Sequence, residues 1–254
     1  MKIKIIVIGL IFSPLSFFGW GAEGHKIVGD VAEKQLKKGV KEKVQKYLGE
    51  MTFEGASVWM DEIKSDHSFD YMKQWHYTNI EKGETYHKAA KGDIIVELQE
   101  VITELKNYKQ MKDEDVNKDL KILFHLCGDI TQPLHVGYGS DKGGNEYKVT
   151  FNDKSTNLHH LWDSEIIKKE NITAESCLMK LRIFRFIESA KKNGIMKVDV
   201  VAWMNDSRSL LPSVYDIKEN TIKQTYLNTA KDEIETQLAK GGLILSTVLN
   251  DIFQ

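Results

Sequence analysis

The segment that decides the fold is His125-Leu126-Cys127-Gly128-Asp129-Ile130-Thr131-Gln132-Pro133-Leu134-His135. Its first part, up to Ile130, belongs to an apolar-periodic stretch at 116–130 that predicts a helix. An irregular loop region is expected at 131–159. His125 and Asp129 are four residues apart and therefore share one face of that helix. A buried imidazole or carboxylate needs a partner to offset its desolvation, and a metal ion is one such partner.

The same four-residue step occurs a second time, from His159 to Asp163. A single step of this kind is better explained as a solvated helical ion pair. Both copies, however, lie among apolar residues, Leu123 to Ile130 in one case and Leu158 to Trp162 in the other. Imidazole together with carboxylate suits zinc, so we interpret both steps as metal ligands.

Four of the remaining histidines can be interpreted from their neighbours alone. His76 lies between two aromatic residues and is either a core histidine or a ligand, and Asp61 is either an exposed turn residue or a ligand. His67 and His87 have polar surroundings, which favours the surface. His160 also reads as a surface residue, because its partner four residues on is a serine.

Hydrophobic periodicity predicts a mainly helical chain. Helical spacing of apolar residues is found at 26–48, after a capping Asp93, and at 116–130, 178–190, 199–211 and 222–252. We expect Gly241 and Gly242 to bend or split the last segment. Residues 146–151 alternate as a strand does, and Asn152-Asp153 follows as a turn. The prediction is an all-α single domain with a short β-hairpin or irregular loop region.

Charge and cysteine content limit the kind of site that the chain can build. The 254 residues include 35 Lys and Arg against 37 Asp and Glu, which is less basic than a duplex-binding module. Any nucleic-acid contact is therefore expected to be local, for instance through metal ions. Cys127 and Cys177 are too few for a zinc–thiolate site, and the sequence leaves open whether they pair.

The amino-terminal residues differ in character from the rest. Lys2 and Lys4 precede an apolar run of secretory-signal length, so we predict a cleaved signal peptide at 1–19 and one domain at 20–254. The protein is then secreted or periplasmic, with no membrane span after cleavage and no obligate protein partner. Cleavage after Gly19 leaves the α-amine and carbonyl of Trp20 as a chelating pair of ligands.

Taken together, these motifs resemble the zinc-dependent single-strand nucleases, a family that includes the mould nucleases and the plant bifunctional nucleases. The zinc phospholipases C share its fold. The resemblance covers most of residues 20–254, with the motifs in the family's order. The matching segments are Trp20-Gly21-x-x-Gly24-His25, Trp59-Met60-Asp61, Trp75-His76, the segment His125 to His135, Gly143-Gly144-Asn145, and Asn157-Leu158-His159-x-x-Trp162-Asp163.

The resemblance implies three zinc ions. It assigns the first to Asp61, His76, His125 and Asp129, the second to Trp20, His25 and Asp129, and the third to His135, His159 and Asp163. Asp129 then bridges the first two ions. Two neighbouring cations lower the pKa of a shared water, which supplies hydroxide for attack on phosphorus. The third zinc stabilises the leaving 3′-oxygen.

The resemblance also implies the reaction and the residues around it. The expected activity is cleavage of single-stranded DNA and RNA to 5′-phosphorylated nucleotides, with 3′-nucleotidase activity. Asp61 and Asp129 have catalytic roles through the metals. Lys64 stands where the best-known nucleases carry arginine, so it offsets phosphate charge without a bidentate fork. Tyr77 is the expected stacking platform for a base and Asn79 the contact to the base edge; ordinary packing and loop bonding is the alternative for both.

Two other functions compete with the nuclease. A phospholipase C on the same fold is the alternative enzyme; the short step from Trp20 to His25, the aspartate at 163 and the Gly-Gly-Asn segment favour the nuclease. A non-catalytic zinc-binding protein is the alternative from another class. Loss of a ligand would favour it, but the sequence has kept every ligand position.

Overall fold

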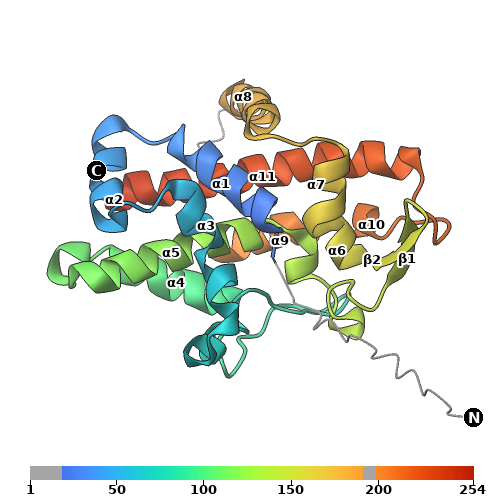
Figure 1. Ribbon diagram of the computed structural model, residues 1–254, viewed down its shortest axis with the longest axis horizontal. Helices are drawn as coiled ribbons and strands as arrows, with labels where there is room; N and C mark the ends of the chain where they lie inside the picture. Colours follow the sequence, from blue (N-terminus) through green and yellow to red (C-terminus); the bar gives the residue numbers. More distant parts are fainter. Residues whose placement is uncertain (1–18, 191–197) are drawn as a thin grey trace, which may run out of the picture.

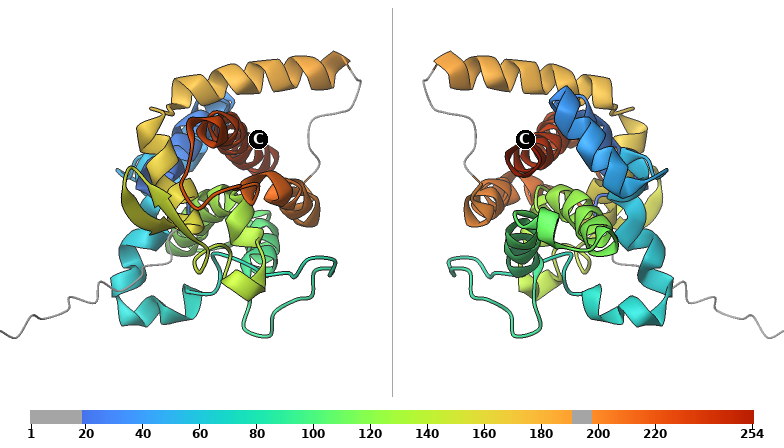
Figure 2. Two further views of the ribbon diagram at one scale, coloured as in Figure 1. Left: turned by 90° about the vertical axis from the view of Figure 1, so that its right-hand side faces the viewer. Right: turned by 90° about the vertical axis from the view of Figure 1, so that its left-hand side faces the viewer.

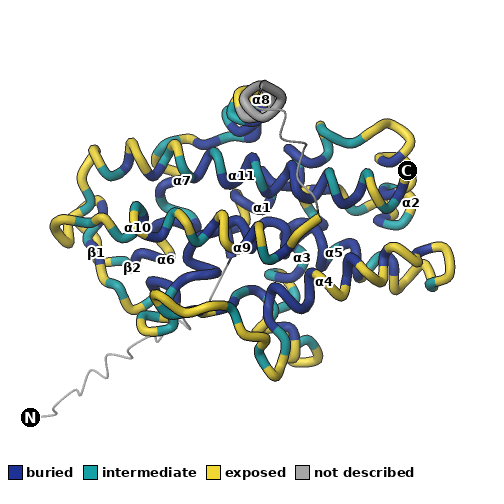
Figure 3. Tube along the Cα trace, turned by 180° about the vertical axis from the view of Figure 1, so that it is seen from behind, coloured by how far each residue is buried: buried dark blue, intermediate teal, exposed yellow. Residues whose placement is uncertain are grey.

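The computed structural model describes residues 19–190 and 198–254 and is built mainly from helices (Figure 1). The longest helix, α11 (Gln224–Ile252), packs against α1 (Ala22–Glu33) and α5 (Asp113–Asp129). Helix α3 (Phe53–Glu62) lies between α1 and α5, and α4 (Ile94–Leu105) covers another side of α5. These helices enclose the buried core, which follows α1, α5 and α11 through the centre of Figure 3.

Shorter elements surround this core. Helix α8 lies against α11 and α1, across the molecule from the loops that follow α3 (Figure 2). The other helices are α2 (Lys38–Leu48), α6 (Leu158–His160), α7 (Ile166–Lys169), α8 (Ala174–Ala190), α9 (Val200–Arg208) and α10 (Leu211–Val214), with a π-helical turn at Leu161–Glu165 and 3₁₀ turns at Ile63–Ser65, His67–Met72, Tyr108–Gln110, Pro133–Val136 and Gly139–Asp141.

The predicted hairpin is present in the loop region. Strand β1 (Lys148–Phe151) pairs antiparallel with β2 (Lys154–Asn157), and Phe151 lies opposite Lys154. Asn152 and Asp153 form the two-residue turn with positive φ angles of 50° and 59°, which these two residue types tolerate well. The all-α prediction with one short hairpin is therefore confirmed.

Helix α4 shows why the polar residue before an apolar-periodic run is informative. The carboxylate of Asp93 accepts hydrogen bonds from the amides of Ile95 (2.9 Å) and Val96 (3.1 Å). These bonds satisfy two of the amide groups that a helix start leaves without partners. The capped helix is present, as the sequence predicts, and it packs on α5.

Three expected helix boundaries are wrong. The segment 26–48 is two helices, because the chain leaves α1 after Glu33 and Lys37 has extended backbone before α2 begins. Helix α9 ends at Arg208, three residues before the predicted end at 211. Helix α11 continues through Gly241 and Gly242 without a break. A Cβ at Gly242 would lie 2.4 Å from Val31, so this glycine allows close packing on α1 instead of bending the helix.

The structure also bears on the expected absence of a membrane span, on the signal peptide and on the two cysteines. Within the described ranges, none of the helices combines the length and the apolar character needed to cross a bilayer. The predicted signal peptide lies outside the described residues, apart from Gly19. Cys127 and Cys177 are both buried and unpaired, which settles for this structure a question that the sequence leaves open.

Candidate metal centre

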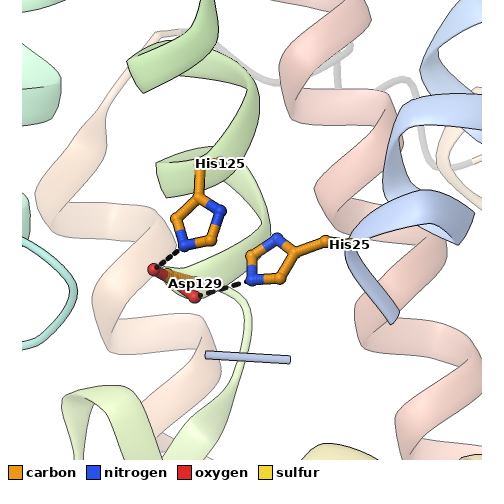
Figure 4. Close-up of side chains that lie close together, drawn as sticks. All are labelled: His25, His125 and Asp129. Carbon is orange, nitrogen blue, oxygen red and sulfur yellow. Dashed lines mark ion pairs between the residues drawn. The ribbon is translucent and has the colours of Figure 1, made fainter. Parts of the chain in front are cut away.

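The centre is built around Asp129, the last residue of α5, whose carboxylate is fully buried. His125, one turn earlier on the same helix, places Nε2 3.1 Å from Asp129 Oδ2. His25 approaches from α1 and places Nε2 3.2 Å from the other oxygen, Oδ1 (Figure 4). The two imidazole rings are stacked with their centroids 3.8 Å apart. One carboxylate therefore faces imidazoles from two helices, each at a different oxygen.

Two more predicted ligands lie in the same cluster, one beside Asp129 and the other beside His125. His76 Nδ1 lies 2.9 Å from Asp129 Oδ2 and 3.0 Å from His125 Nε2. Asp61, near the end of α3, has Oδ1 3.6 Å from His125 Nε2. His76, which the sequence leaves undecided between core and ligand, thus lies in the cluster. So does Asp61, whose side chain is only 10% exposed.

A second cluster lies beyond Asp129 and contains His135, His159 and Asp163, all buried. His159 Nε2 is 3.2 Å from His135 Nε2 and 3.3 Å from Asp163 Oδ2. Gln132 donates from its side-chain amide to the other oxygen of Asp163, at 2.5 Å. The His159–Asp163 step is helical, as expected, although part of it is a π-helical turn.

Backbone carbonyls fix the orientation of three of these rings. In each, Nδ1 donates to a main-chain oxygen, and Nε2 faces another histidine of the cluster. The three bonds are His125 to the Ser57 oxygen (2.7 Å), His135 to the His76 oxygen (2.7 Å) and His159 to the Gly143 oxygen (2.6 Å). Such bonds are typical of histidines that bind metal ions.

The polar atoms left without partners show that these residues fit cations. Both nitrogens of His25 and the Oδ1 oxygen of Asp129 are buried without a hydrogen bond. Leaving such atoms unsatisfied in an interior is costly. Three sets of ligand atoms, each set within 4.8 Å, can each hold a metal ion: His25, His125 and Asp129; Asp61, His76 and His125; and His135, His159 and Asp163. The last set coincides with the third expected zinc site.

The electrostatics of the first cluster also favour bound cations. Burial opposes ionisation of Asp129, but His125 and His135 hold the pKa of its carboxyl well below the usual value. Burial and the charge of Lys64 lower the pKa of His76 to about 3, so this imidazole is neutral and ready to bind a metal. Burial would lower the pKa of His125 as well, but the carboxylates of Asp129 and Asp61 outweigh it and raise that pKa. Binding of a metal ion to His125 would compete with protonation of its ring.

The start of the described chain runs directly past this cluster. A Cβ built on Gly19 would lie 1.7 Å from Asp129 Oδ1 and 2.7 Å from His25 Nε2, so the backbone at 19–20 touches both. Trp20 is fully buried, and its indole N–H donates to Thr131. A Cβ at Gly128 would lie 2.8 Å from His25 Nδ1, which explains why the residue before Asp129 is glycine. The amine that cleavage after Gly19 would create therefore lies beside the expected second ion.

A pocket of about 350 Å³ opens beside the two clusters. Both predicted substrate contacts, Tyr77 and Asn79, line it. The other lining residues are Lys73, His76, Leu134, His135, Lys142, Asn145 and His159. Lys64 lies outside this lining and places Nζ 2.5 Å from Asp61 Oδ1. The structure thus brings together every predicted ligand side chain and both predicted pocket residues.

Sequence reasoning missed several residues of the centre. Gln132 supports Asp163, and the signal for it was its place between Asp129 and His135 in the quoted segment. Asn145 follows two glycines in one of the motifs of the resemblance, which predicts no contact for it, but the residue lines the pocket. Lys73 and Lys142 line the pocket and carried no sequence signal. His67, His87 and His160 are exposed, as expected.

The fold and the site define a helical protein with three largely buried His/Asp groups that could each hold a metal ion, beside a pocket. Comparison with known proteins agrees with this class. Residues 20–254 match the family model described as S1/P1 Nuclease, and the chain belongs to that family. It is similar to Endonuclease 2 of Arabidopsis thaliana, with 27% identity over 98% of this chain and 96% of the relative.

Two fungal relatives extend the comparison. Nuclease P1 of Penicillium citrinum is 25% identical over 92% of this chain and 97% of the relative. Nuclease S1 of Aspergillus oryzae is 28% identical over 59% of this chain and 55% of the relative. The family and the names of these relatives identify the chain as a nuclease, with nucleic acid as the substrate class.

Proposed function

We propose that this protein is a secreted, zinc-dependent nuclease that cleaves single-stranded DNA and RNA to 5′-phosphorylated nucleotides and also removes phosphate from 3′-nucleotides. The observation that carries the proposal is the position of the pocket. The residues that line it include Tyr77 and Asn79 together with His76, His135 and His159 from both clusters. A base bound in the pocket therefore has its phosphate beside the candidate metal ligands.

Preference for single strands follows from the pocket. A base can stack on the Tyr77 ring only after it has left the stack of its neighbouring bases. The free-energy cost of this step is lower in a single strand than in a duplex, where the base pair must also be broken. Asn79 carries an amide that can both donate to and accept from the edge of a base. Because every base has a π-face, the stacking contact by itself selects little between bases.

Zinc fits the donor set of imidazoles and carboxylates, and bound zinc supplies a low-pKa water and stabilises charge on the phosphate. The residues then have distinct tasks. Asp129 can serve two neighbouring ions through its two oxygens, since different imidazoles face each oxygen. Lys64 places a positive charge beside Asp61 at the rim of the first cluster, where it can offset the charge of the phosphate.

The test is release of acid-soluble nucleotides from single-stranded DNA and RNA by protein that begins at Trp20. Duplex DNA, a 3′-nucleotide and phosphatidylcholine are assayed beside them, with and without chelator. Chelator-sensitive cleavage of the single strands, slow cleavage of duplex and release of phosphate from the 3′-nucleotide support the proposal. Cleavage of lipid without cleavage of polynucleotide would contradict it and favour the phospholipase C.

A further inference from the structure

Two chain segments that are far apart in sequence form the pocket wall side by side. Residues 76–80 run in the same direction as residues 135–137. The amide of Thr78 donates to the His135 oxygen at 2.9 Å, and the amide of Ile80 donates to the Gly137 oxygen at 3.0 Å. The first segment carries His76, Tyr77 and Asn79, and the second begins at His135. The spacing of these two segments therefore sets the position of the base pocket relative to the metal ligands.

Arg208, the last residue of α9, joins both segments at the end that lies away from the metals. One arm of its guanidinium donates to the carbonyls of Val136 and Gly137, the latter at 3.2 Å. The other arm donates to the Ile80 carbonyl at 2.8 Å. The Tyr138 ring lies 5.8 Å from the guanidinium carbon, in cation–π range.

Hydrogen bonds to neighbouring segments hold the end of α9 that carries Arg208. Ser207, the preceding residue, donates to the Ile130 oxygen at 2.7 Å, just beyond the end of α5. Gln237 on α11 donates to both the Thr131 oxygen (2.8 Å) and the Ser207 hydroxyl (3.1 Å). The end of α9 that carries Arg208 is thus held to α11 and to the residues that directly follow α5, the helix that carries His125 and Asp129.

From this geometry we infer that Arg208 is a positioning residue for substrate binding: it fixes Tyr77 and Asn79 at the correct distance from the His135 side of the pocket. The inference rests on the proposed function for its effect on catalysis. Arg208 itself is not among the residues that line the pocket. It acts through the main chain of the two segments that do.

A lysine cannot take over this task. The guanidinium presents donors in a rigid planar fork that reaches two segments at once, whereas an ammonium group is a single point. His76 and His135 keep their own mutual bond, from His135 Nδ1 to the His76 oxygen. Loosening the Arg208 end should therefore disturb the base pocket more than it disturbs the metal ligands.

The experiment compares Arg208→Lys and Arg208→Ala with the wild type. Arg182→Lys, an exposed arginine on α8, is the matched control. KM and kcat are measured on a single-stranded oligonucleotide, zinc per chain by mass spectrometry, and amide hydrogen exchange at residues 78, 80 and 137. For Arg208→Lys we expect KM to rise about tenfold or more, as for the loss of charge-assisted hydrogen bonds. Bound zinc should be unchanged, kcat should change less than KM, and exchange at these amides should be faster.

Added methylguanidinium should restore part of the lost affinity in Arg208→Ala, since that variant leaves space for it. Unchanged KM and unchanged exchange in both variants would overturn the inference, as would a fall in thermal stability with no change in KM. If the wild type cleaves no single strands, the proposed function fails by itself. Hydrogen exchange still tests the positioning role in that case, because it needs no substrate.

Discussion

Asp129 and Asp163 are both buried aspartates among histidines, yet the pKa values of their carboxyl groups shift in opposite directions. Asp129 has imidazoles at both oxygens, and His125 and His135 keep the pKa of its carboxyl well below the usual value against the effect of burial. Burial raises the pKa of Asp163 well above the usual value, although Gln132 donates to it. The difference teaches that neighbouring imidazoles favour the ionised form of Asp129, whereas burial favours the protonated form of Asp163.

The largest effect that this comparison predicts is that of Asp129→Asn. The amide keeps the shape of the side chain but removes the negative charge that two ions of the first cluster would share. Nuclease activity should therefore fall by more than about 100-fold, since even indirect partners of metal ligands contribute roughly 10- to 100-fold. Rates of single-strand cleavage measure it. Asp153→Asn, in the exposed hairpin turn, is the matched control and should retain activity. Wild-type rates for Asp129→Asn would reject the shared carboxylate.

Asp163→Asn should have a smaller effect, because it removes one ligand of one cluster. We expect a loss of activity of roughly 10- to 100-fold, the range typical of perturbed metal sites. The same cleavage assay measures it, in parallel with Asp129→Asn. If Asp163→Asn were the more damaging of the two, the ranking of the clusters would be reversed.

A residue added before Trp20 should reduce metal binding at the Asp129 cluster and leave the Asp163 cluster loaded. An internal amide is a poor ligand, and the backbone at Gly19 already touches Asp129 and His25. Protein that begins at Trp20 and protein that begins at Gly19 are compared for zinc per chain. The expected difference is about one ion. An equal number of zinc ions per chain in the two forms would show that the Trp20 amine is not a ligand.

The smallest effect concerns the stability of metal-free protein against pH, where the two aspartates should differ in sign. The lowered pKa of Asp129 stabilises the fold above the pKa of the unfolded chain, and this contribution is lost as pH falls through the folded pKa. The raised pKa of Asp163 means that the folded state holds its proton more tightly. Stability from Asp163 therefore declines as pH rises from the unfolded to the folded pKa.

Thermal unfolding of chelated protein, from well below the unfolded-chain aspartate pKa of about 3.9 up to pH 7, can separate these contributions. Asp163→Asn should flatten the loss of stability toward higher pH, because the amide mimics the protonated acid. Asp129→Asn should flatten the loss toward lower pH. Identical pH profiles for the two variants would show that their carboxyl groups share one environment.

Much of this centre could be predicted because its ligands lie in local patterns. The steps His125–Asp129 and His159–Asp163 place two ligands on one helical face each, and the apolar flanks indicate burial. The helix cap at Asp93 and the hairpin turn at Asn152 are equally local signals. Each depends on residues within a few positions of one another.

The parts that could not be predicted depend on contacts between distant segments. Gly242 looks like a helix breaker in sequence, but its task is set by Val31 on another helix. Arg208 has an unremarkable sequence context and gains its importance only from the carbonyls of Ile80 and Val136. The opposite pKa shifts of Asp129 and Asp163 likewise depend on which neighbours tertiary packing supplies.

The most direct test of the central claim, that Asp129 serves two ions and Asp163 one, is a count of zinc per chain. Native mass spectrometry of protein that begins at Trp20 would give the number for wild type, Asp129→Asn and Asp163→Asn. The account predicts three ions for the wild type, two for Asp163→Asn and no more than one tightly bound ion for Asp129→Asn. Equal losses from the two variants, or a wild type with a single ion, would contradict it.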